Sequence, residues 1–184
     1  MRSGRRYGLV LFFFLMFVGS TGVTIMQIND FRTSEAARNG AEKLAELPTL
    51  KTQRLIAMEP VGISKEKEPF YTDAVAEAMN EMNLEALQRE NEDIVGWIMI
   101  PDTEISYPLL QGEDNTYYLE HTWEHTKSRG GSIFLEQMCS RDLTDYNTII
   151  YGHRMKNRSM FGSLAFYQEK EYLENHPYIY LADS

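Results

Sequence analysis

Twenty consecutive residues without a charged side chain, from Tyr7 to Met26, follow three arginines in the first six positions. As a helix rising about 1.5 Å per residue, this run reaches about 30 Å, which matches the hydrocarbon thickness of a bilayer. Because arginines favour the cytoplasmic side, the pattern predicts a cytoplasmic tail at 1–6, a single transmembrane anchor at 7–26 and an extracellular remainder. The cell membrane is therefore a predicted partner.

A cleaved signal peptide is the alternative interpretation of this run. It would have a shorter apolar core and would end at a site of small residues. The nearest approach to such a site is Gly19 to Gly22. The full length of the run favours an uncleaved anchor.

The rest of the chain is acidic, because all 27 Asp and Glu residues but only part of the 18 Lys and Arg residues lie after Met26. Such a surface favours solubility and argues against a nucleic-acid partner, whose phosphates need basic side chains. The single cysteine, Cys139, excludes an internal disulfide. An exported protein without disulfides fits a bacterial surface better than a eukaryotic secretory route.

A stalk and linker are predicted over 27–72. Residues 29–47 favour a helix or a semi-ordered stalk, and 60–69 has the composition of a linker. An apolar stripe predicts a packing helix over 73–91. The folded domain is expected at 73–184.

From Asp93 onward, apolar residues recur with the period of two that is typical of strands. Five short strands are expected, at 94–100, 105–110, 132–135, 148–153 and 178–181. Short helical segments are expected at 116–120 and 161–167. Closely spaced strands with few helices between them favour an antiparallel barrel or sandwich over alternating strand–helix units.

His153 ends the fourth expected strand, and a polar loop containing Arg154 and Arg158 follows it. Histidine has an ordinary pKa close to neutrality, so a histidine at a strand end beside a groove is a candidate acid/base group. A purely structural histidine is the alternative. His176, which precedes Pro177, has the pattern of a turn residue.

The stretch from His121 to His125 has the pattern H-x-x-E-H. On a helix, the two histidines could bind zinc while Glu124 served as a general base. The segment 127–131 would break such a helix almost at once, and no third ligand is evident. A zinc peptidase using His121 and His125 is therefore the least favoured alternative.

Cys139, Ser159 and Ser163 are the remaining candidate nucleophiles. A free cysteine is more often a small buried hydrophobe than a reactive thiol, which needs a neighbour that lowers its pKa. Neither serine stands in a G-x-S-x-G elbow, so a serine hydrolase is not favoured.

Five segments together resemble the class B sortases, which are membrane-bound cysteine transpeptidases of Gram-positive bacteria. They are NEDIVGWIMI at 91–100, ISYPLLQG at 105–112, DNTYYL at 114–119, GSIFL at 131–135 and NTIIYGHRMKNRSMFGSL at 147–164. Their order and spacing agree with the family from about residue 73 onward. The predicted anchor and exported domain agree as well.

The resemblance implies a mainly β fold, an antiparallel barrel with N-terminal helices. It implies that a cysteine thiolate attacks an NPQTN-like sorting motif of a secreted protein, and that an amine of a peptidoglycan precursor resolves the thioacyl enzyme. A histidine protonates the leaving amine and an arginine stabilises the oxyanion. The resemblance assigns the catalytic histidine to His153 and substrate contacts to Asn115, Leu119 and Tyr151, with no cofactor and no metal.

One part of the family pattern is missing. The family's nucleophile follows a T-L-x-T-C motif beyond the histidine, and the catalytic arginine comes later still. This sequence has no such motif, and Cys139 precedes His153. The expectation is an incomplete, C-terminally truncated sortase barrel that is inactive. A non-catalytic, membrane-anchored extracellular peptide-binding module is the alternative.

Overall fold

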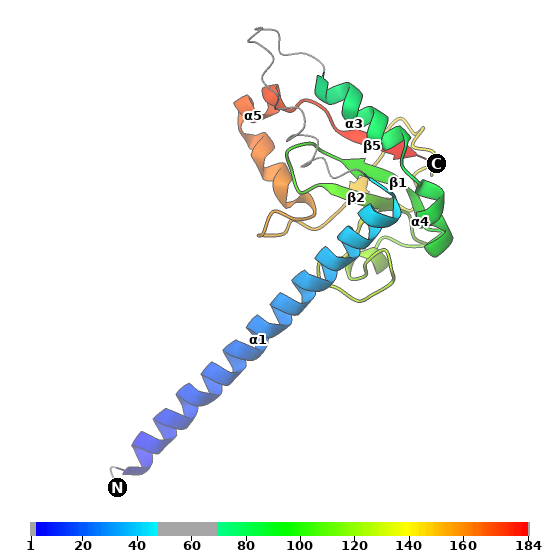
Figure 1. Cartoon of the computed structure of the whole chain (residues 1–184). Helices are drawn as coiled ribbons and strands as arrows, with labels where there is room; N and C mark the ends of the chain where they lie inside the picture. Colours follow the sequence, from blue (N-terminus) through cyan, green and yellow to red (C-terminus); the bar gives the residue numbers. More distant parts are fainter. Residues whose placement is uncertain (1–2, 48–69, 184) are drawn as a thin grey trace.

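The computed structural model describes residues 3–47 and 70–183, so the predicted linker at 60–69 lies outside the described residues. The helices are α1 (Ser3–Leu44), α3 (Phe70–Asn80), α4 (Leu84–Glu90) and α5 (Lys170–Asn175), with 3-10 helices η1 (Tyr117–Leu119) and η2 (Phe161–Gln168). The strands are β1 (Ile94–Met99), β2 (Ser106–Leu110), β3 (Ile133–Leu135), β4 (Ile150–Tyr151) and β5 (Tyr180–Asp183). Only the C-terminal end of α1 lies against the sheet (Figure 1).

The five strands form one mixed sheet in the order β4-β3-β2-β1-β5. Strand β1 pairs antiparallel with β2 and with β5, and β3 pairs antiparallel with β4. Strands β2 and β3 are parallel. The strands expected from the sequence are all present, although β4 is much shorter than expected.

The predicted incomplete antiparallel barrel is therefore corrected in the direction of its strands, whereas an unclosed sheet agrees with an incomplete barrel. The sheet is mixed because the long connection 111–132 returns the chain so that β3 runs in the same direction as β2, which a short hairpin turn cannot do. The sheet is also open, because β4 and β5 are its two ends and do not pair with each other. Period-two patterning identifies strands, but it carries no information on their relative direction.

The core lies on both faces of β1, which pairs with β2 on one side and with β5 on the other. Trp97 and Met99 belong to a cluster beneath α1, α3 and α4, whereas Ile98 and Ile100 belong to a second cluster on the opposite face. The pairing with β2 shifts between Ile94 and Gly96, as in a β-bulge. This extra residue returns Ile94 to the same face as Trp97, and every residue of β1 is buried.

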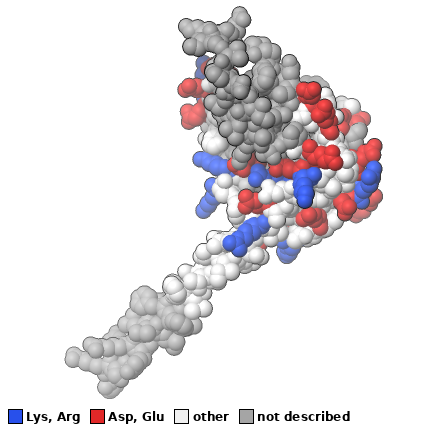
Figure 2. Space-filling model, in the orientation of Figure 1, with Lys and Arg blue, Asp and Glu red and all other residues white. Residues whose placement is uncertain are grey.

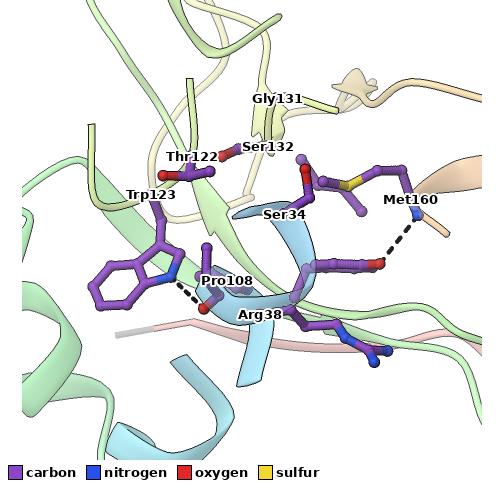
Figure 3. Close-up of a pocket in the computed structure, with 11 residues that line it drawn as sticks. Ser34, Arg38, Pro108, Thr122, Trp123, Gly131, Ser132 and Met160 are labelled. Atoms are coloured by element: carbon purple, nitrogen blue, oxygen red, sulfur yellow. Dashed lines mark hydrogen bonds between the residues drawn. The ribbon is translucent and has the colours of Figure 1, made fainter. Parts of the chain in front are cut away.

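The C-terminal turns of α1 are part of this core. Ala37 and Ala41 lie four residues apart on one face of the helix, Ala45 follows directly after the helix end, and all three are buried. The indole Nε1 of Trp123 donates to the carbonyl of Ala37 over 2.7 Å (Figure 3). The predicted stalk at 29–47 is thus helical as far as Leu44, and its last turns pack against the sheet.

The helix expected over 73–91 is two helices. The first, α3, ends at Asn80, and Asn83 caps the second, because its side-chain oxygen accepts from the Ala86 amide over 3.1 Å. An asparagine at this position favours a cap over the middle of a helix. The break lets α3 pack near β5 while α4 packs near β1.

In the part of the chain that the structure describes, no helix has the length and hydropathy needed to cross a membrane. The transmembrane anchor predicted at 7–26 falls within α1 and is not supported by the structure. The predicted domain boundaries are not tested and stay predictions.

The charged side chains of the folded part are mixed in sign. On the face in Figure 2, acidic side chains separate the basic ones, so the basic side chains form no continuous patch among the residues coloured there. This distribution agrees with the net charge of −9. It offers no extended basic surface for a phosphate backbone on that face.

Candidate functional site

His153 lies just after β4, and its imidazole is half-buried. Its Nε2 lies 2.8 Å from the carbonyl oxygen of Leu119. A carbonyl oxygen can only accept, so the neutral imidazole must carry its hydrogen on Nε2. Nδ1 has no hydrogen-bond partner among the described residues and is the nitrogen left to accept a proton.

The backbone on both sides of His153 is held. Its carbonyl accepts from the amide of Phe161 over 2.9 Å, at the start of η2. Arg154 pairs with Met160 in an isolated antiparallel bridge, which closes the polar loop between them. The loop is therefore a tight structure rather than an extension of β4.

Leu119 is the last residue of η1, and a carboxylate stabilises the beginning of this helix. Asp114 Oδ1 accepts from the amides of Thr116 and Tyr117 and from the Thr116 hydroxyl. These hydrogen bonds hold the pKa of Asp114 below its ordinary value. On the other side, the backbone of Gly131 approaches the Leu119 carbonyl closely. The acceptor for His153 thus has a fixed place.

The side chain of Asn115 makes its hydrogen bonds to the loop that follows β3. Its side-chain nitrogen donates to Glu136 over 2.8 Å, and its oxygen accepts from the amide of Gln137. Glu136 in turn donates its own amide to the carbonyl of Ile149, directly before β4. The segment 114–119 is therefore tied to the strand that leads to His153.

Tyr151 lies in β4 and keeps 38% of its surface exposed. Its ring centroid is 5.4 Å from that of the buried Phe134, which also neighbours Tyr118 at 6.4 Å. The structure thus gathers His153, Leu119, Asn115 and Tyr151 around β3 and β4. The ring of Tyr151 is the part of this group that stays open to solvent, because His153 and Leu119 are both half-buried.

The H-x-x-E-H pattern is not on a helix. The amide of Thr122 donates to the carbonyl of Thr126, which folds 121–127 into a turn. His121 stacks on Tyr117 with centroids 4.1 Å apart, and His125 Nδ1 lies 3.2 Å from the Tyr117 hydroxyl. The described residues contain no cluster of three potential metal ligands. The geometry that the zinc alternative required is absent.

The other candidate nucleophiles do not reach His153 by any hydrogen bond within the described residues. The sulfur of Cys139 lies 3.9 Å from the carbonyl of Asn147, and the side chain packs with the second core cluster. Ser163 is fully buried and donates to the Arg158 carbonyl over 2.6 Å. Ser159 bonds Asn157 within its own loop.

His176 is a structural histidine. It stacks on Tyr172 at 4.0 Å and lies 3.5 Å from an Asp102 carboxylate oxygen. It therefore closes the end of α5 onto the β1–β2 turn, as expected for a turn residue.

The pocket in Figure 3 lies between α1 and the sheet, and His153 is not among the residues that line it. Its residues include Ser34 and Arg38 of α1, and its volume is about 10 Å³. A space of that size holds at most one water molecule. It is therefore a small gap in the packing between α1 and the sheet.

The fold is similar to that of solved sortase B structures. A Bacillus anthracis sortase B in complex with AAEK1 has a TM-score of 0.62 and 31% identity, over 85% of this chain and 63% of that one. A Staphylococcus aureus sortase B–substrate complex has a TM-score of 0.61 and 27% identity, over 84% and 60%. No family model matches the chain.

The amino-acid sequence matches curated sortase B proteins at higher identity than the structural neighbours above. Sortase B of Listeria monocytogenes is 51% identical over 94 residues, which are 51% of this chain and 38% of that protein. Over this matched segment the chain is a homologue of the class B sortases, and the resemblance found in the sequence is confirmed. The matched segment spans well under half the length of that relative.

Residues that the sequence did not single out hold this arrangement together. Glu136 joins Asn115 to β4, and Tyr118 anchors η1 in the core. The motif DNTYYL offered a sequence signal for Tyr118. It is an aromatic residue directly before Leu119, and neighbouring residues of a turn point in different directions, so a core position for Tyr118 could have been expected. Glu136 had no such signal, since exposed carboxylates are common.

Proposed function

We propose that this chain acts in sortase-type peptide transfer, with His153 as the acid/base group. The observation that carries the proposal is the 2.8 Å contact between His153 Nε2 and the Leu119 carbonyl. It joins the two segments to which the family resemblance assigns the site. It also leaves Nδ1 without a hydrogen-bond partner among the described residues, so this nitrogen can accept a proton.

The proposed substrate is a secreted protein with a C-terminal NPQTN-like sorting signal, and the proposed acceptor is an amine of a peptidoglycan precursor. Asn115, Leu119 and Tyr151 are the proposed substrate contacts. Support comes from the partly exposed ring of Tyr151 and from the likeness to a sortase B–substrate complex. We infer a role at the cell surface from the same relatives.

The reaction needs a thiolate within reach of the histidine. Cys139 is the single cysteine of these 184 residues, and its sulfur faces the Asn147 carbonyl. We therefore propose that Cys139 is not the nucleophile. A polypeptide of these residues alone should bind the sorting peptide without cleaving it.

The test is to incubate the 184-residue polypeptide with a fluorogenic NPQTN peptide and to follow binding and cleavage separately. Saturable binding without cleavage or a thioacyl adduct is expected. Cleavage that survives Cys139→Ala but disappears with His153→Ala would overturn the claim of inactivity and would require another nucleophile. Absence of any binding would overturn the assignment of the peptide site.

A non-catalytic peptide-binding module is the second candidate, and the environment of Cys139 favours it. The two candidates differ in what His153 does. If the chain is only a binding module, His153→Ala should change peptide affinity little. If His153 is an acid/base group, it acts only together with a thiol that the rest of the site supplies. Adding a polypeptide that carries the remaining sortase segments should restore cleavage only under the first candidate.

A further inference from the structure

Tyr118 occupies a fully buried position directly before Leu119. Its hydroxyl donates to Asp93 Oδ2 over 2.7 Å and accepts from the Asn91 side-chain nitrogen over 3.0 Å. Burial is the first cause that raises the pKa of this hydroxyl. A phenol in this setting stays neutral and can act as both donor and acceptor.

Asn91 makes this group of side chains a closed network. Its side-chain nitrogen also donates to the Trp123 carbonyl over 2.6 Å, and its oxygen accepts from the Asp93 amide over 2.9 Å. The network therefore joins the α4–β1 connection to the segment that contains Tyr118. A buried polar network whose groups all have partners fixes one arrangement of the segments it connects.

The Tyr118 side chain and the Leu119 carbonyl belong to neighbouring residues of the three-residue helix η1. The ring goes into the core, while the Leu119 carbonyl accepts from His153. The Tyr118 carbonyl accepts from the Ser132 amide over 2.8 Å, which fastens the same turn to the start of β3. A displacement of Tyr118 must therefore displace the acceptor of His153.

We propose that Tyr118, held by Asn91 and Asp93, is a positioning residue that fixes the orientation and tautomer of His153 through the Leu119 carbonyl. The role in catalysis rests on the proposed function, because it matters only if His153 transfers protons. Fixing the hydrogen on Nε2 keeps Nδ1 as the acceptor in the neutral ring. An imidazole that changed tautomer freely would present the wrong nitrogen for part of the time.

The proposed role of the network residues is indirect, so the test measures His153 itself. The full 184-residue chain, labelled with ¹⁵N in histidine, is compared as wild type and Tyr118→Phe by NMR without any peptide. The wild type should show His153 as the Nε2–H tautomer with a slowly exchanging Hε2. Tyr118→Phe should speed this exchange about tenfold, the factor expected for the loss of an ordinary hydrogen bond.

Two further variants guard against a general loss of folding. Asp93→Ala removes the acceptor of the Tyr118 hydroxyl and should change the His153 signals in the same way. Asp93→Asn keeps an oxygen at that place and should restore them. Each variant is checked by thermal unfolding and is measured well below its transition.

The controls remove hydroxyls elsewhere. The buried Tyr167 hydroxyl has no partner among the described residues, so Tyr167→Phe removes a hydroxyl without breaking a bond. Ser106→Ala removes the acceptor of the Trp97 indole, a bond of 3.3 Å in the same core cluster. Neither control should alter the His153 signals.

Unchanged His153 signals in folded Tyr118→Phe and Asp93→Ala would overturn the proposal and leave Tyr118 as a packing residue. Equal changes in the controls would overturn it too, because the effect would then be general. Since no peptide is present, this result is independent of whether the chain binds or cleaves a sorting signal. Failure of the proposed function would appear in the peptide assay alone.

Discussion

The backbone of Gly131 lies so close to the Leu119 carbonyl that a Cβ at Gly131 would meet its oxygen at 2.5 Å. The same Cβ would meet the Tyr118 carbonyl oxygen at 2.4 Å, and Gly131 has a φ of +57°. Both the close approach and the backbone conformation therefore require glycine. The turn that supports η1 has no room for a side chain.

Gly131→Ala should consequently destabilise the protein by at least about 2 kcal/mol, since the left-handed conformation alone costs 1–2 kcal/mol for other residues. Urea unfolding measures the change. Gly22→Ala is the matched control, because its Cβ would have nothing within 4 Å and the residue lies in α1. A helical glycine replaced by alanine should be neutral or slightly stabilising. Equal effects of the two substitutions would contradict the prediction.

The docking of α1 gives a second prediction. Ala41 is fully buried against the sheet, whereas Ala36 on the same helix is exposed. Ala41→Leu should cost about 1–3 kcal/mol, because added methylenes do not fit a filled core. Ala36→Leu should change the free energy of unfolding by less than about 0.5 kcal/mol.

Limited proteolysis supplies an independent measurement of the same docking. If Ala41→Leu forces the helix from the sheet, the bond between Trp123 and the Ala37 carbonyl is also lost. Cleavage within 37–45 should then be faster in this variant than in Ala36→Leu. Identical cleavage patterns would show that the packing between α1 and the sheet tolerates a larger side chain.

A third prediction concerns pH. The hydrogen bonds from the Thr116 and Tyr117 amides lower the pKa of Asp114 from its ordinary value of 3.8. Because the pKa is lower in the folded state, the stabilisation is present above the unfolded pKa and is lost as the pH falls through the folded pKa. Asp114→Asn should therefore flatten the loss of stability that the wild type shows below about pH 4.

Thermal unfolding of both proteins across the acid range measures this difference. Glu113→Gln removes a neighbouring exposed charge that caps no helix, and it should leave the acid profile unchanged. An identical change in both variants would mean that net charge, rather than the hydrogen bonds of Asp114 to Thr116 and Tyr117, controls the slope.

The sequence predicted the strands and the family, but it did not predict the relative directions of the strands in the sheet. The apolar runs in β1 and β2 identify strands because both faces of each are buried. The parallel pairing of β2 with β3 depends on the path of 111–132, a segment without a periodic pattern. Sequence patterns are local, whereas strand direction is set by where a long connection ends.

The candidate site was predicted to a similar extent. The family motif pointed to His153 and Leu119, and the structure brings their side chain and carbonyl together. The network of Tyr118 with Asn91 and Asp93 joins residues that are far apart in the sequence. A single sequence without geometry gives no reason to group them.

The last prediction separates peptide contact from structural support within the site. Tyr151 is partly exposed and Asn115 is bonded to Glu136 and Gln137. Tyr151→Ala should weaken binding of an NPQTN peptide about tenfold with little loss of stability, as expected for one aromatic contact. Asn115→Ala should weaken binding and also cost about 1–3 kcal/mol of stability, because its partners lose their bonds.

Fluorescence anisotropy of a labelled peptide and urea unfolding measure the two quantities on the same samples. Tyr178→Ala is the matched control, since this tyrosine is also exposed. It lies two residues before β5, the strand at the opposite end of the sheet from β4. It should leave peptide affinity unchanged. If Tyr151→Ala and Tyr178→Ala change peptide affinity alike, the peptide does not bind beside β4. The residues around His153 would then have a structural role only.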